Sequence, residues 1–370
     1  MNDTGPLAVF FTHGVSLELW EKRGMFSREI KFYEELAKET GEIWMFTYGK
    51  NDGVYQERLH PLLRIFPKNI AVPNMLYAFL IPFVYRKQLS QVKCLRIHQM
   101  AGAIPALLSH WFFRKPLIVR CGYQWSTFLK HQHASTFKQW IVSIWERLVY
   151  HTASHIIVTT KEDQQTVSSN YAIAPEKMTI IPNYIDTELF KPLEIKKEKR
   201  SVCFVGRLEP QKNLLNLIQA IKNTDIHLLC YGEGSQLEHL KQQAQIDQVN
   251  VSFLGRIPNK ELPAALNACE LFILPSLFEG NPKVLLEAMT CGLPVIGTNV
   301  EGISSLIEHN HNGILCEPTV ESIRQAILDL LDQPNKQQQL GQAARNTMLE
   351  TSSLKHAIER EITILQHSLL

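Results

Sequence analysis

Short apolar runs alternate with amphipathic stretches along the whole chain. Runs rich in β-branched and aromatic residues predict strands, and stretches with an apolar residue every third or fourth position predict helices. The strands predicted in the first half are Leu7–Thr12, Glu42–Tyr48, Leu95–His98, Leu117–Arg120, His155–Thr160 and Met178–Pro182. The helices predicted between them are Ser27–Thr40, Ala103–Phe113, Ala134–His151 and Glu162–Tyr171. Strands that alternate with helices favour parallel sheets built from β-α-β units.

The alternation pauses at Asn183–Arg200, which is polar and ends in a run of charges, and then resumes. The strands predicted after this pause are Ser201–Val205, Ile226–Cys230, Val251–Leu254, Leu271–Leu274 and Leu293–Gly297. The helices predicted between them are Leu214–Ile221, Gln236–Gln245, Glu261–Ala268 and Pro282–Cys291, and Ser353–Leu370 forms a last amphipathic helix. The pattern therefore repeats one architecture twice.

The chain has 370 residues, more than one hydrophobic core usually holds, because single cores stop growing near ~250–300 residues. We therefore predict an α/β protein with two Rossmann-like, doubly wound domains that face a central cleft. Ligands of open α/β sheets bind beyond the carboxyl ends of the strands, so this cleft is the expected site. The predicted division is residues 1–185 for the first domain, 186–200 for a linker, 201–350 for the second domain and 351–370 for a C-terminal helix that packs back on the first domain.

Composition narrows the class of protein. The 38 Lys and Arg nearly balance the 36 Asp and Glu, so the chain lacks the basic excess typical of nucleic-acid binding. Seven scattered cysteines without a C-x-x-C motif fit a reducing cytosol. The first residues lack the basic region of a signal peptide, and the apolar stretch Ala71–Tyr85 is interrupted by two prolines and too short to span a membrane. We predict a cytoplasmic protein that is soluble or peripheral to a membrane.

The segment Gly206–Asn213 (GRLEPQKN) follows one predicted strand and leads into a helix. A glycine lets the backbone approach a ligand closely, and the N-terminus of a helix offers unpaired N–H groups to an anion. Arg207 and Lys212 add two positive charges to the same loop. The loop suits a diphosphate, and the alternative is an ordinary polar surface turn.

The segment Glu279–Glu287 (EGNPKVLLE) also joins a strand to a helix. Pro282 suits the first helical position, where its missing N–H breaks no hydrogen bond. Glu287 interrupts a helix that is otherwise apolar, and a buried carboxylate is costly unless it has a partner. Two interpretations remain for Glu287: an ion pair with Lys283 one turn earlier, or hydrogen bonds from ligand hydroxyls.

Both segments resemble motifs of a known family. Glu279–Glu287 matches an E-x7-E motif, and Gly206–Asn213 matches a G-R-L-x3-K-N loop. Ile181–Asp186 is similar to I-P-N-G-V-D, with Tyr184 in the place of the glycine.

Three further matches follow the family's order: Tyr231–Gly234 (G-x-G), Phe253–Arg256 (F-L-G) and Cys291–Val295 (C-G-L-P-V). The likeness is dense between about Ile180 and Pro318 and thinner before that. The chain thus resembles the retaining GT-B glycosyltransferases of the family 4 group, which includes sucrose-phosphate synthases and bacterial polysaccharide and lipid glycosyltransferases.

This resemblance implies that the second domain binds a nucleotide diphosphate-sugar and the first domain binds the acceptor. Arg207 and Lys212 would bind the diphosphate and neutralise it as it leaves, and Glu279 would hold the transferred sugar. These three residues are the implied catalytic set. Glu287 would accept the ribose hydroxyls. The other implied donor contacts are the glycine loop at Gly24, Gly206, and the main chain near Arg256 and Ile257. The last implied contacts are the consecutive residues Gly280, Asn281, Pro282 and Lys283.

The chain departs from the family in two places. Glu301–Ser305 keeps one glycine of a usual pair and has Ser305 where a glutamate is common. Many members have a histidine after the fourth strand, near the reacting carbon, and Cys121 occupies that position. No general base is therefore assigned. His98, which ends another strand, is the nearest histidine, and it is either an acceptor contact or a structural residue.

No cofactor or metal is expected besides the nucleotide-sugar co-substrate. The sequence contains no D-x-D, the motif of metal-bridged diphosphate sites. The histidine pairs His131/His133 and His151/His155 have no Cys, Asp or Glu at ligand spacing, so surface histidines are favoured.

Aromatic residues lie beside basic ones in the first domain, as in Met75–Lys87 and Trp111–Lys115, and Trp140, Trp145 and Arg147 share one helix. Such a mixture suits a membrane interface. Core packing beside a solvated edge is the alternative interpretation.

We predict a retaining, metal-independent hexosyltransferase type of enzyme that acts on a glycan or lipid-linked acceptor in cell-surface polysaccharide or glycolipid synthesis. It would work in the cytoplasm or at the inner face of the membrane. A GT-B-like nucleotide-sugar epimerase and an inactive nucleotide-sugar-binding scaffold are the alternatives. The donor, the acceptor, the linkage and the oligomeric state do not follow from the sequence.

Overall fold

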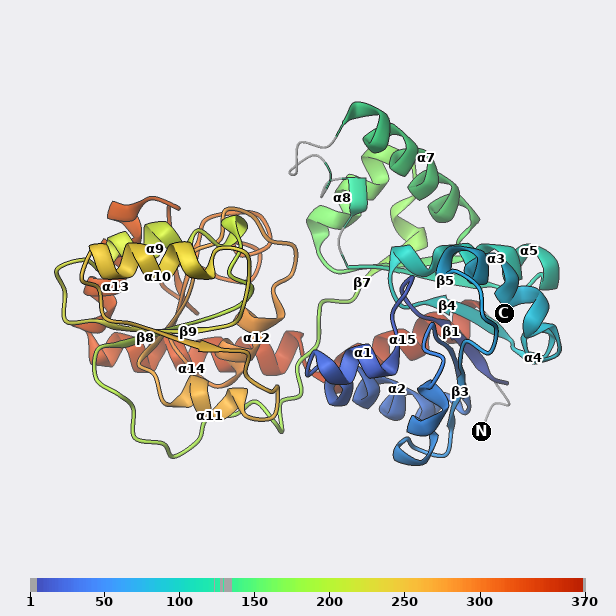
Figure 1. The fold of residues 1–370 in the computed structure, drawn as a ribbon, viewed down its shortest axis with the longest axis horizontal. Coiled ribbons are helices and arrows are strands. Elements are labelled where there is room, and N and C mark those ends of the chain that lie inside the picture. Colours follow the sequence, from blue (N-terminus) through green and yellow to red (C-terminus); the bar gives the residue numbers. More distant parts are fainter. Residues whose placement is uncertain (1–4, 123, 127–128, 130–134, 369–370) are drawn as a thin grey trace. The chain divides into compact units, whose positions relative to one another are not determined.

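The computed structural model describes residues 5–122, 124–126, 129 and 135–368. The chain forms two compact units (Figure 1): unit 1 comprises Met1–Pro182 and Ala357–Leu370, and unit 2 comprises Asn183–His356. The expected linker, residues 186–200, belongs to unit 2. Its backbone is fixed there, because Leu193 N–H donates to Asn267 Oδ1 (2.9 Å) and Glu198 N–H donates to Ala268 O (2.8 Å).

Unit 1 has a seven-stranded sheet in which every pair of neighbours is parallel. The sheet order is β3-β2-β1-β4-β5-β6-β7. The strands are β1 (Leu7–Phe10), β2 (Ile43–Phe46), β3 (Leu63–Phe66), β4 (Cys94–Ile97), β5 (Leu117–Cys121), β6 (His155–Val158) and β7 (Met178–Ile180). The direction of the chain across the sheet reverses between β1 and β4.

Helices cover both faces of this sheet, with α3 and α5 on one face and α2 and α15 on the other (Figure 1). The helices of unit 1 are α1 (Leu17–Lys22), α2 (Phe26–Thr40), α3 (Asn74–Val84), α4 (Arg86–Gln91), α5 (Ala103–Phe113), α7 (Thr136–Thr152), α8 (Lys161–Tyr171) and α15 (Leu354–Ser368). None of the helices in the described part of the chain is long and apolar enough to cross a membrane.

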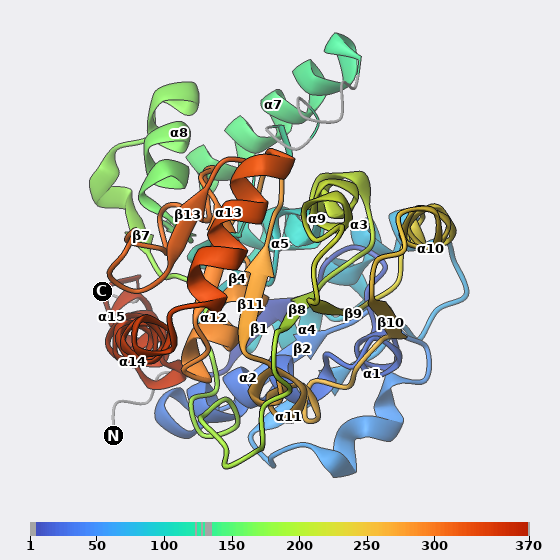
Figure 2. The same cartoon turned by 90° about the vertical axis from the view of Figure 1, so that its left-hand side faces the viewer.

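Unit 2 has a six-stranded parallel sheet in the order β10-β9-β8-β11-β12-β13. Its strands are β8 (Ser201–Val205), β9 (His227–Tyr231), β10 (Val251–Gly255), β11 (Leu271–Leu274), β12 (Val295–Thr298) and β13 (Ile314–Cys316). Its helices are α9 (Leu214–Ala220), α10 (Leu237–Ile246), α11 (Leu262–Asn267), α12 (Lys283–Thr290), α13 (Val320–Leu331) and α14 (Pro334–Thr351). Figure 2 shows these elements from the side.

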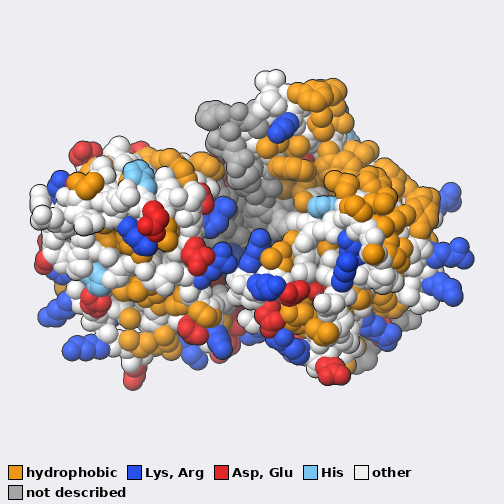
Figure 3. Space-filling view, viewed as in Figure 1, with side chains coloured by type: hydrophobic (Ala, Val, Ile, Leu, Met, Phe, Trp, Pro, Cys, Tyr) orange, Lys and Arg blue, Asp and Glu red, His pale blue; other side chains and the backbone are white. Residues whose placement is uncertain are grey.

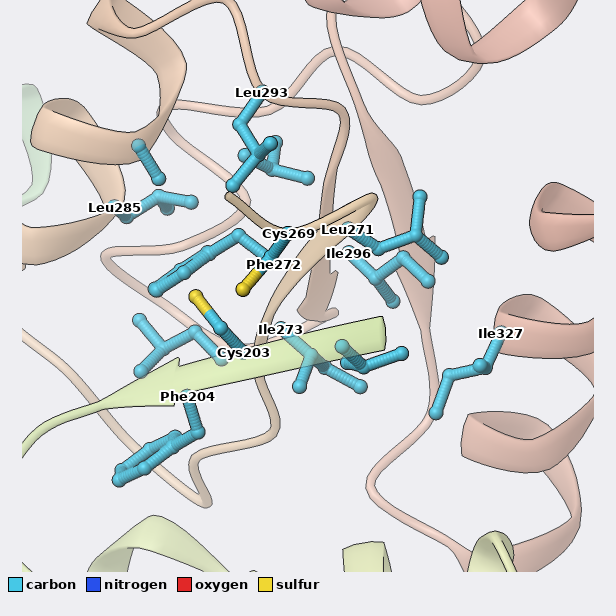
Figure 4. Close-up of a cluster of buried hydrophobic side chains, with 14 of the residues drawn as sticks. Cys203, Phe204, Cys269, Leu271, Phe272, Ile273, Leu285, Leu293, Ile296 and Ile327 are labelled. Carbon is cyan, nitrogen blue, oxygen red and sulfur yellow. The ribbon is translucent and has the colours of Figure 1, made fainter. Parts of the chain in front are cut away.

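The core of unit 2 follows from its central strand. All four residues of β11 (LFIL) are fully buried, since helices cover both faces of a parallel sheet. Figure 4 shows Phe272 and Ile273 among side chains from α12 and α13, with the sulfur atoms of Cys203 and Cys269 close together. All seven cysteines are free and buried.

Candidate active site

The two motif segments of unit 2 meet at one point of its sheet. β8 and β11 are neighbours, and the order of the strands reverses between them. Such a switch point leaves a crevice beyond the carboxyl ends of the strands, where open α/β sheets bind ligands. Gly206–Asn213 follows β8, and Pro275–Asn281 follows β11. The topology therefore brings the segments together, as their position after two strands suggests.

Hydrogen bonds join these two loops into one surface. Leu277 N–H donates to Gln211 O (2.8 Å), and Gln211 Nε2 donates to Phe278 O (2.7 Å). Asn213, at φ +55°, ends the first loop and precedes α9. Asparagine tolerates this left-handed conformation better than most residues. These contacts couple the positions of the two loops.

Lys212 and Glu279 form an ion pair across the two loops. Their side chains are 11% and 9% exposed, and the Ser276 hydroxyl also donates to Glu279 Oε1 (2.6 Å). A charge this far from water needs a partner, and each residue supplies the other's. The sequence motifs indicated a diphosphate for Lys212 and a sugar for Glu279 but not the contact between the two side chains.

Arg207 is exposed at the start of the same loop. Two residues later, Glu209 accepts from the Ser235 hydroxyl (2.6 Å) and from Ser235 N–H (3.1 Å), and these bonds lower the pKa of the Glu209 carboxyl. Glu209 thereby ties the loop after β8 to the turn after β9. The Arg207 side chain remains exposed to solvent next to these hydrogen bonds.

Glycines allow the backbone of three loops to touch. Gly232 has φ +144°, and a Cβ at this position would overlap the carbonyl oxygen of Gly206. A Cβ at Gly234 would likewise overlap Leu208 O. Because only glycine fits such approaches, the G-x-G turn is a structural requirement of the loop that holds Arg207 and Lys212.

Gly302 has the same function on the other side of the site. Its φ is +85°, and a Cβ there would overlap the carbonyl oxygen of Gly280. This contact explains why one glycine of the usual pair is present. Ser305, where the family often has a glutamate, is exposed and donates its hydroxyl to Gly302 O (3.3 Å).

Glu287 lies inside α12 and is 3% exposed. Asn259 Nδ2, from the loop after β10, donates to Glu287 Oε1 (3.4 Å), a partner that neither sequence interpretation included. Ile257 is half-buried in the same loop. Arg256 is exposed and pairs with Glu233 at 2.8 Å. The elements expected to hold the ribose and the base are therefore neighbours.

The start of α12 differs from the prediction by one residue. Pro282 is the N-cap, and the helix begins at Lys283. Asn183 makes two hydrogen bonds to Asn281, the residue before Pro282. Its N–H donates to Asn281 Oδ1 (3.3 Å), and its Nδ2 donates to Asn281 O (2.7 Å). The Lys283 ammonium lies 5.2 Å from the ring centroid of Tyr184, the residue that replaces the family glycine. The I-P-N-Y segment thus supports the E-x7-E segment, a link that the sequence did not indicate.

In unit 1, Gly24 and His98 lie in separate loops. Gly24, at φ +67°, separates α1 from α2. His98 follows β4 at the switch point, where its N–H donates to Phe10 O (2.9 Å) at the end of β1.

A hydrogen-bond chain holds the ring of His98 in place. Arg96 Nη1 donates to the Tyr33 hydroxyl oxygen (3.0 Å), and this oxygen is 2.7 Å from His98 Nδ1. A guanidinium can only donate, so the Tyr33 oxygen accepts from Arg96, and the short contact with Nδ1 holds the His98 ring in place. Nε2 is 3.8 Å from Glu29 Oε2. This network supports the structural interpretation of His98.

Cys121 is fully buried at the end of β5, and the Tyr150 hydroxyl donates to its sulfur (3.2 Å). The position that often holds a histidine is therefore closed to solvent in this protein.

The described residues contain no group of three or more His, Cys, Asp or Glu arranged to hold a metal ion. His151 contacts Tyr171 O (3.0 Å), and His155 contacts the Thr179 hydroxyl (2.8 Å). His131 and His133 lie outside the described residues.

Comparison with known proteins identifies the family. The family model "Glycosyltransferase Family 4" matches residues 30–189, and the model "Glycosyl transferases group 1" matches residues 185–347. The chain is 30% identical over 201 residues to UDP-Gal:alpha-D-GlcNAc-diphosphoundecaprenol alpha-1,3-galactosyltransferase of Escherichia coli, which is 48% of this chain and 51% of that protein. It is 26% identical over 254 residues to alpha-maltose-1-phosphate synthase of Mycolicibacterium smegmatis, which is 60% of this chain and 66% of that protein. The chain thus spans about half to two thirds of the length of these relatives.

Solved structures show the same fold. Sucrose-phosphate synthase from Thermosynechococcus elongatus superposes with a TM-score of 0.79 at 18% identity, over 98% of each chain. The Anabaena protein HepE, solved with UDP and glucose, gives a TM-score of 0.76 at 19% identity, over 98% of this chain and 99% of that chain. The two Rossmann-like units therefore form a GT-B fold, and the chain belongs to the family 4 type of GT-B glycosyltransferases.

Proposed function

We propose that this protein is a retaining glycosyltransferase that moves a sugar from a nucleotide diphosphate donor to a glycan or lipid-linked acceptor. The observation that carries the proposal is the pairing of Lys212 with Glu279 beyond the carboxyl ends of β8 and β11. The relatives point the same way, since the Escherichia coli enzyme is named for a UDP-sugar donor and a lipid diphosphate acceptor. Synthesis of cell-surface polysaccharide or glycolipid is the process we infer.

Donor binding is assigned to unit 2. Arg207 and Lys212 would contact the diphosphate, and Glu279 would hold the sugar. Glu287 would accept the ribose hydroxyls, beside a base that lies against the loop of Arg256 and Ile257. A uridine nucleotide is the first candidate, because HepE was solved with UDP.

The chemical step needs a good leaving group more than a strong base. The bond between the anomeric carbon and the β-phosphate oxygen breaks, and the nucleoside diphosphate takes the electron pair. The acceptor oxygen forms the new bond on the same face of the sugar, and its proton goes to the departing phosphate oxygen. Lys212 and Arg207 would supply positive charge where the negative charge develops, and electrostatic stabilisation of this kind is usually the largest single contribution to catalysis. Their presence also motivates the proposal that no metal is required.

The acceptor is assigned to unit 1, near His98. We place the protein in the cytoplasm, because the seven cysteines are free and buried. Burial raises the pKa of the Cys230 thiol to about 12, so this sulfur is kept as a neutral thiol.

A panel of nucleotide-sugars tests this proposal against its two alternatives. A transferase releases free nucleotide when the acceptor is present, and the product keeps the anomeric configuration of the donor. An epimerase rearranges the sugar without releasing nucleotide, and a scaffold binds the donor and changes nothing. Nucleotide-sugars that bind the protein raise its melting temperature. If none of these nucleotide-sugars yields free nucleotide when the acceptor is present, the proposed activity is contradicted.

A further inference from the structure

The basic residues of the chain are distributed unevenly. Residues 58–161 contain 14 Lys and Arg and a single acidic residue, Glu146, although the whole chain is nearly balanced. Glu146 is fully buried, where it accepts from Trp125 N–H (2.8 Å) and the Tyr171 hydroxyl (2.5 Å). This part of unit 1 therefore has no exposed negative side chain among its described residues.

The same segment carries most of the exposed apolar surface. Eleven of the nineteen large hydrophobic side chains that are exposed in the described residues lie on three helices, α3, α5 and α7. We call this set the apolar patch. Its members are Met75, Leu76, Phe79, Phe83, Trp111, Phe112, Phe137, Trp140, Ile141, Ile144 and Leu148.

Helix α3 is apolar on every side. Its inner face buries Tyr77, Ala78 and Ile81, and the sequence NMLYAFLIPFV contains no charged residue. Its outer face exposes Phe79 (47%) and Phe83 (56%) instead of the polar side chains expected there. A helix that is hydrophobic all round is typical of burial in protein or in lipid, not of contact with water.

Helix α7 has two apolar stripes on opposite sides. Val142 and Val149 point into the unit, while Phe137 (66%), Trp140 (60%) and Ile144 (49%) are exposed at a spacing of three or four residues. Packing inside unit 1 explains the buried stripe of Val142 and Val149, but it does not explain the exposed stripe. The exposed stripe, from 137 to 148, is roughly 17 Å long at 1.5 Å per residue.

The three helices form one surface. Helix α5 contacts both α3 and α7, and the rings of Phe83 and Phe112 are 5.0 Å apart. Figure 3 shows hydrophobic side chains gathered over this part of unit 1, with basic side chains at the margin. The basic residues on or next to these helices are Arg86, Lys87, Arg114, Lys115, Lys138 and Arg147.

We propose that the apolar patch is a docking surface for an anionic lipid bilayer. Aromatic and aliphatic side chains with Lys and Arg beside them, and no acid among them, fit the boundary between acyl chains and negatively charged headgroups. The stripe of α7 would lie in the plane of the membrane. The inference needs neither the donor site nor the transferase activity, although a lipid-linked acceptor would be delivered to such a surface.

Vesicle binding by the full chain tests the proposal without donor or acceptor. At low salt, the protein sediments with vesicles of phosphatidylcholine and phosphatidylglycerol, and high salt releases it because surface charges are screened. Vesicles of phosphatidylcholine alone bind it at least about tenfold more weakly, since several basic residues contribute to the anionic surface. Equal binding to both vesicles, or no binding to either at low salt, would overturn the proposal.

Point variants locate the surface. Trp140→Glu and Phe79→Glu, on different helices, each weaken vesicle binding about tenfold or more, and Arg86→Gln weakens it by roughly fivefold. The controls Val54→Glu and Ile246→Glu change residues that are 71% and 73% exposed outside the patch, and they leave binding unchanged. Equal losses in the controls would refute the assignment.

Two further measurements test whether the variants fold and whether the apolar patch is instead an interface between copies of the chain. Each variant keeps the urea-unfolding transition that the tryptophans of unit 1 report, which shows that unit 1 is folded. If Trp140→Glu converts an oligomer to a monomer and leaves vesicle binding unchanged, the patch is an interface between copies of the chain and the lipid proposal is wrong.

Discussion

Replacing Glu361 by alanine should destabilise unit 1 strongly. Glu361 of α15 is fully buried, and it receives two hydrogen bonds from Arg96 of β4, through Nε to Oε1 and through Nη2 to Oε2 (3.1 Å). Arg96 is itself 2% exposed. The variant leaves the guanidinium buried without its carboxylate. Such a loss costs about 3–5 kcal/mol, because the desolvated charge keeps its penalty and loses its partner.

Tryptophan fluorescence reports this change for unit 1 alone. All six tryptophans, at positions 20, 44, 111, 125, 140 and 145, lie in unit 1. With an m-value of about 2–3 kcal/mol/M in urea, the predicted loss lowers the midpoint of the fluorescence transition by about 1–2.5 M. A probe of unit 2, such as the rise in its melting temperature on donor binding, should be unaffected by the variant.

A surface pair provides the control. Glu18 is 2.5 Å from Lys22, with side chains 49% and 70% exposed, and Glu18→Ala should cost less than about 0.5 kcal/mol. The double variant Arg96→Met, Glu361→Leu should be more stable than Glu361→Ala, because it removes both charges together. Equal shifts of the midpoint for Glu361→Ala and Glu18→Ala would contradict a stabilising role of the buried ion pair.

Four further outcomes are expected. Lys212→Ala should lower kcat about 10²-fold or more at saturating donor, since its charge stabilises the departing diphosphate more than the bound donor; unchanged turnover would remove Lys212 from the mechanism. Glu287→Ala should weaken donor binding by roughly 1.5–3 kcal/mol as measured by calorimetry, once circular dichroism shows that this buried position still folds. Gly232→Ala should lower both the melting temperature and the donor affinity, because the added methyl group overlaps Gly206 O; a melting temperature equal to that of the wild type would contradict the close approach. Activity should persist in excess chelator, and a loss that magnesium or manganese reverses would argue for a metal site.

Local patterns predicted most of the fold. β8, β11 and α5 begin and end where the sequence placed them, because each is a short apolar run between residues that break regular structure. Helix α3 was missed. Pro82 suggested an interruption, but it lies in the last turn, where it removes one backbone hydrogen bond and the helix continues to Val84. β13, α13 and α14 fall in a stretch for which no elements were predicted.

The candidate site was only partly predictable. The strand-loop-helix context placed Gly206–Asn213 and Glu279–Glu287 at the carboxyl edge of the sheet. The pairing of Lys212 with Glu279 joins residues 67 apart and depends on β8 lying beside β11, which no local pattern encodes. The sequence shows the spacing of Gly232 and Gly234. It does not show that these glycines approach the carbonyl oxygens of Gly206 and Leu208. Arg96 looked like any charged residue, and its buried partner follows 265 residues later.

That separation matters while the protein is being made. The ribosome must add 265 residues after Arg96 before Glu361 exists, which takes roughly 13–53 s at ~5–20 residues per second. Once the chain has passed residue 180, all seven strands of unit 1 exist, but the buried guanidinium still lacks its carboxylate. We therefore expect nascent chains stalled before residue 361 to be cut by protease within β4 and α2, and chains stalled far enough beyond it to resist. Equal resistance of the two chains would show that the N-terminal segment completes its fold alone. If the expectation holds, the last helix determines when the first unit of the protein becomes stable.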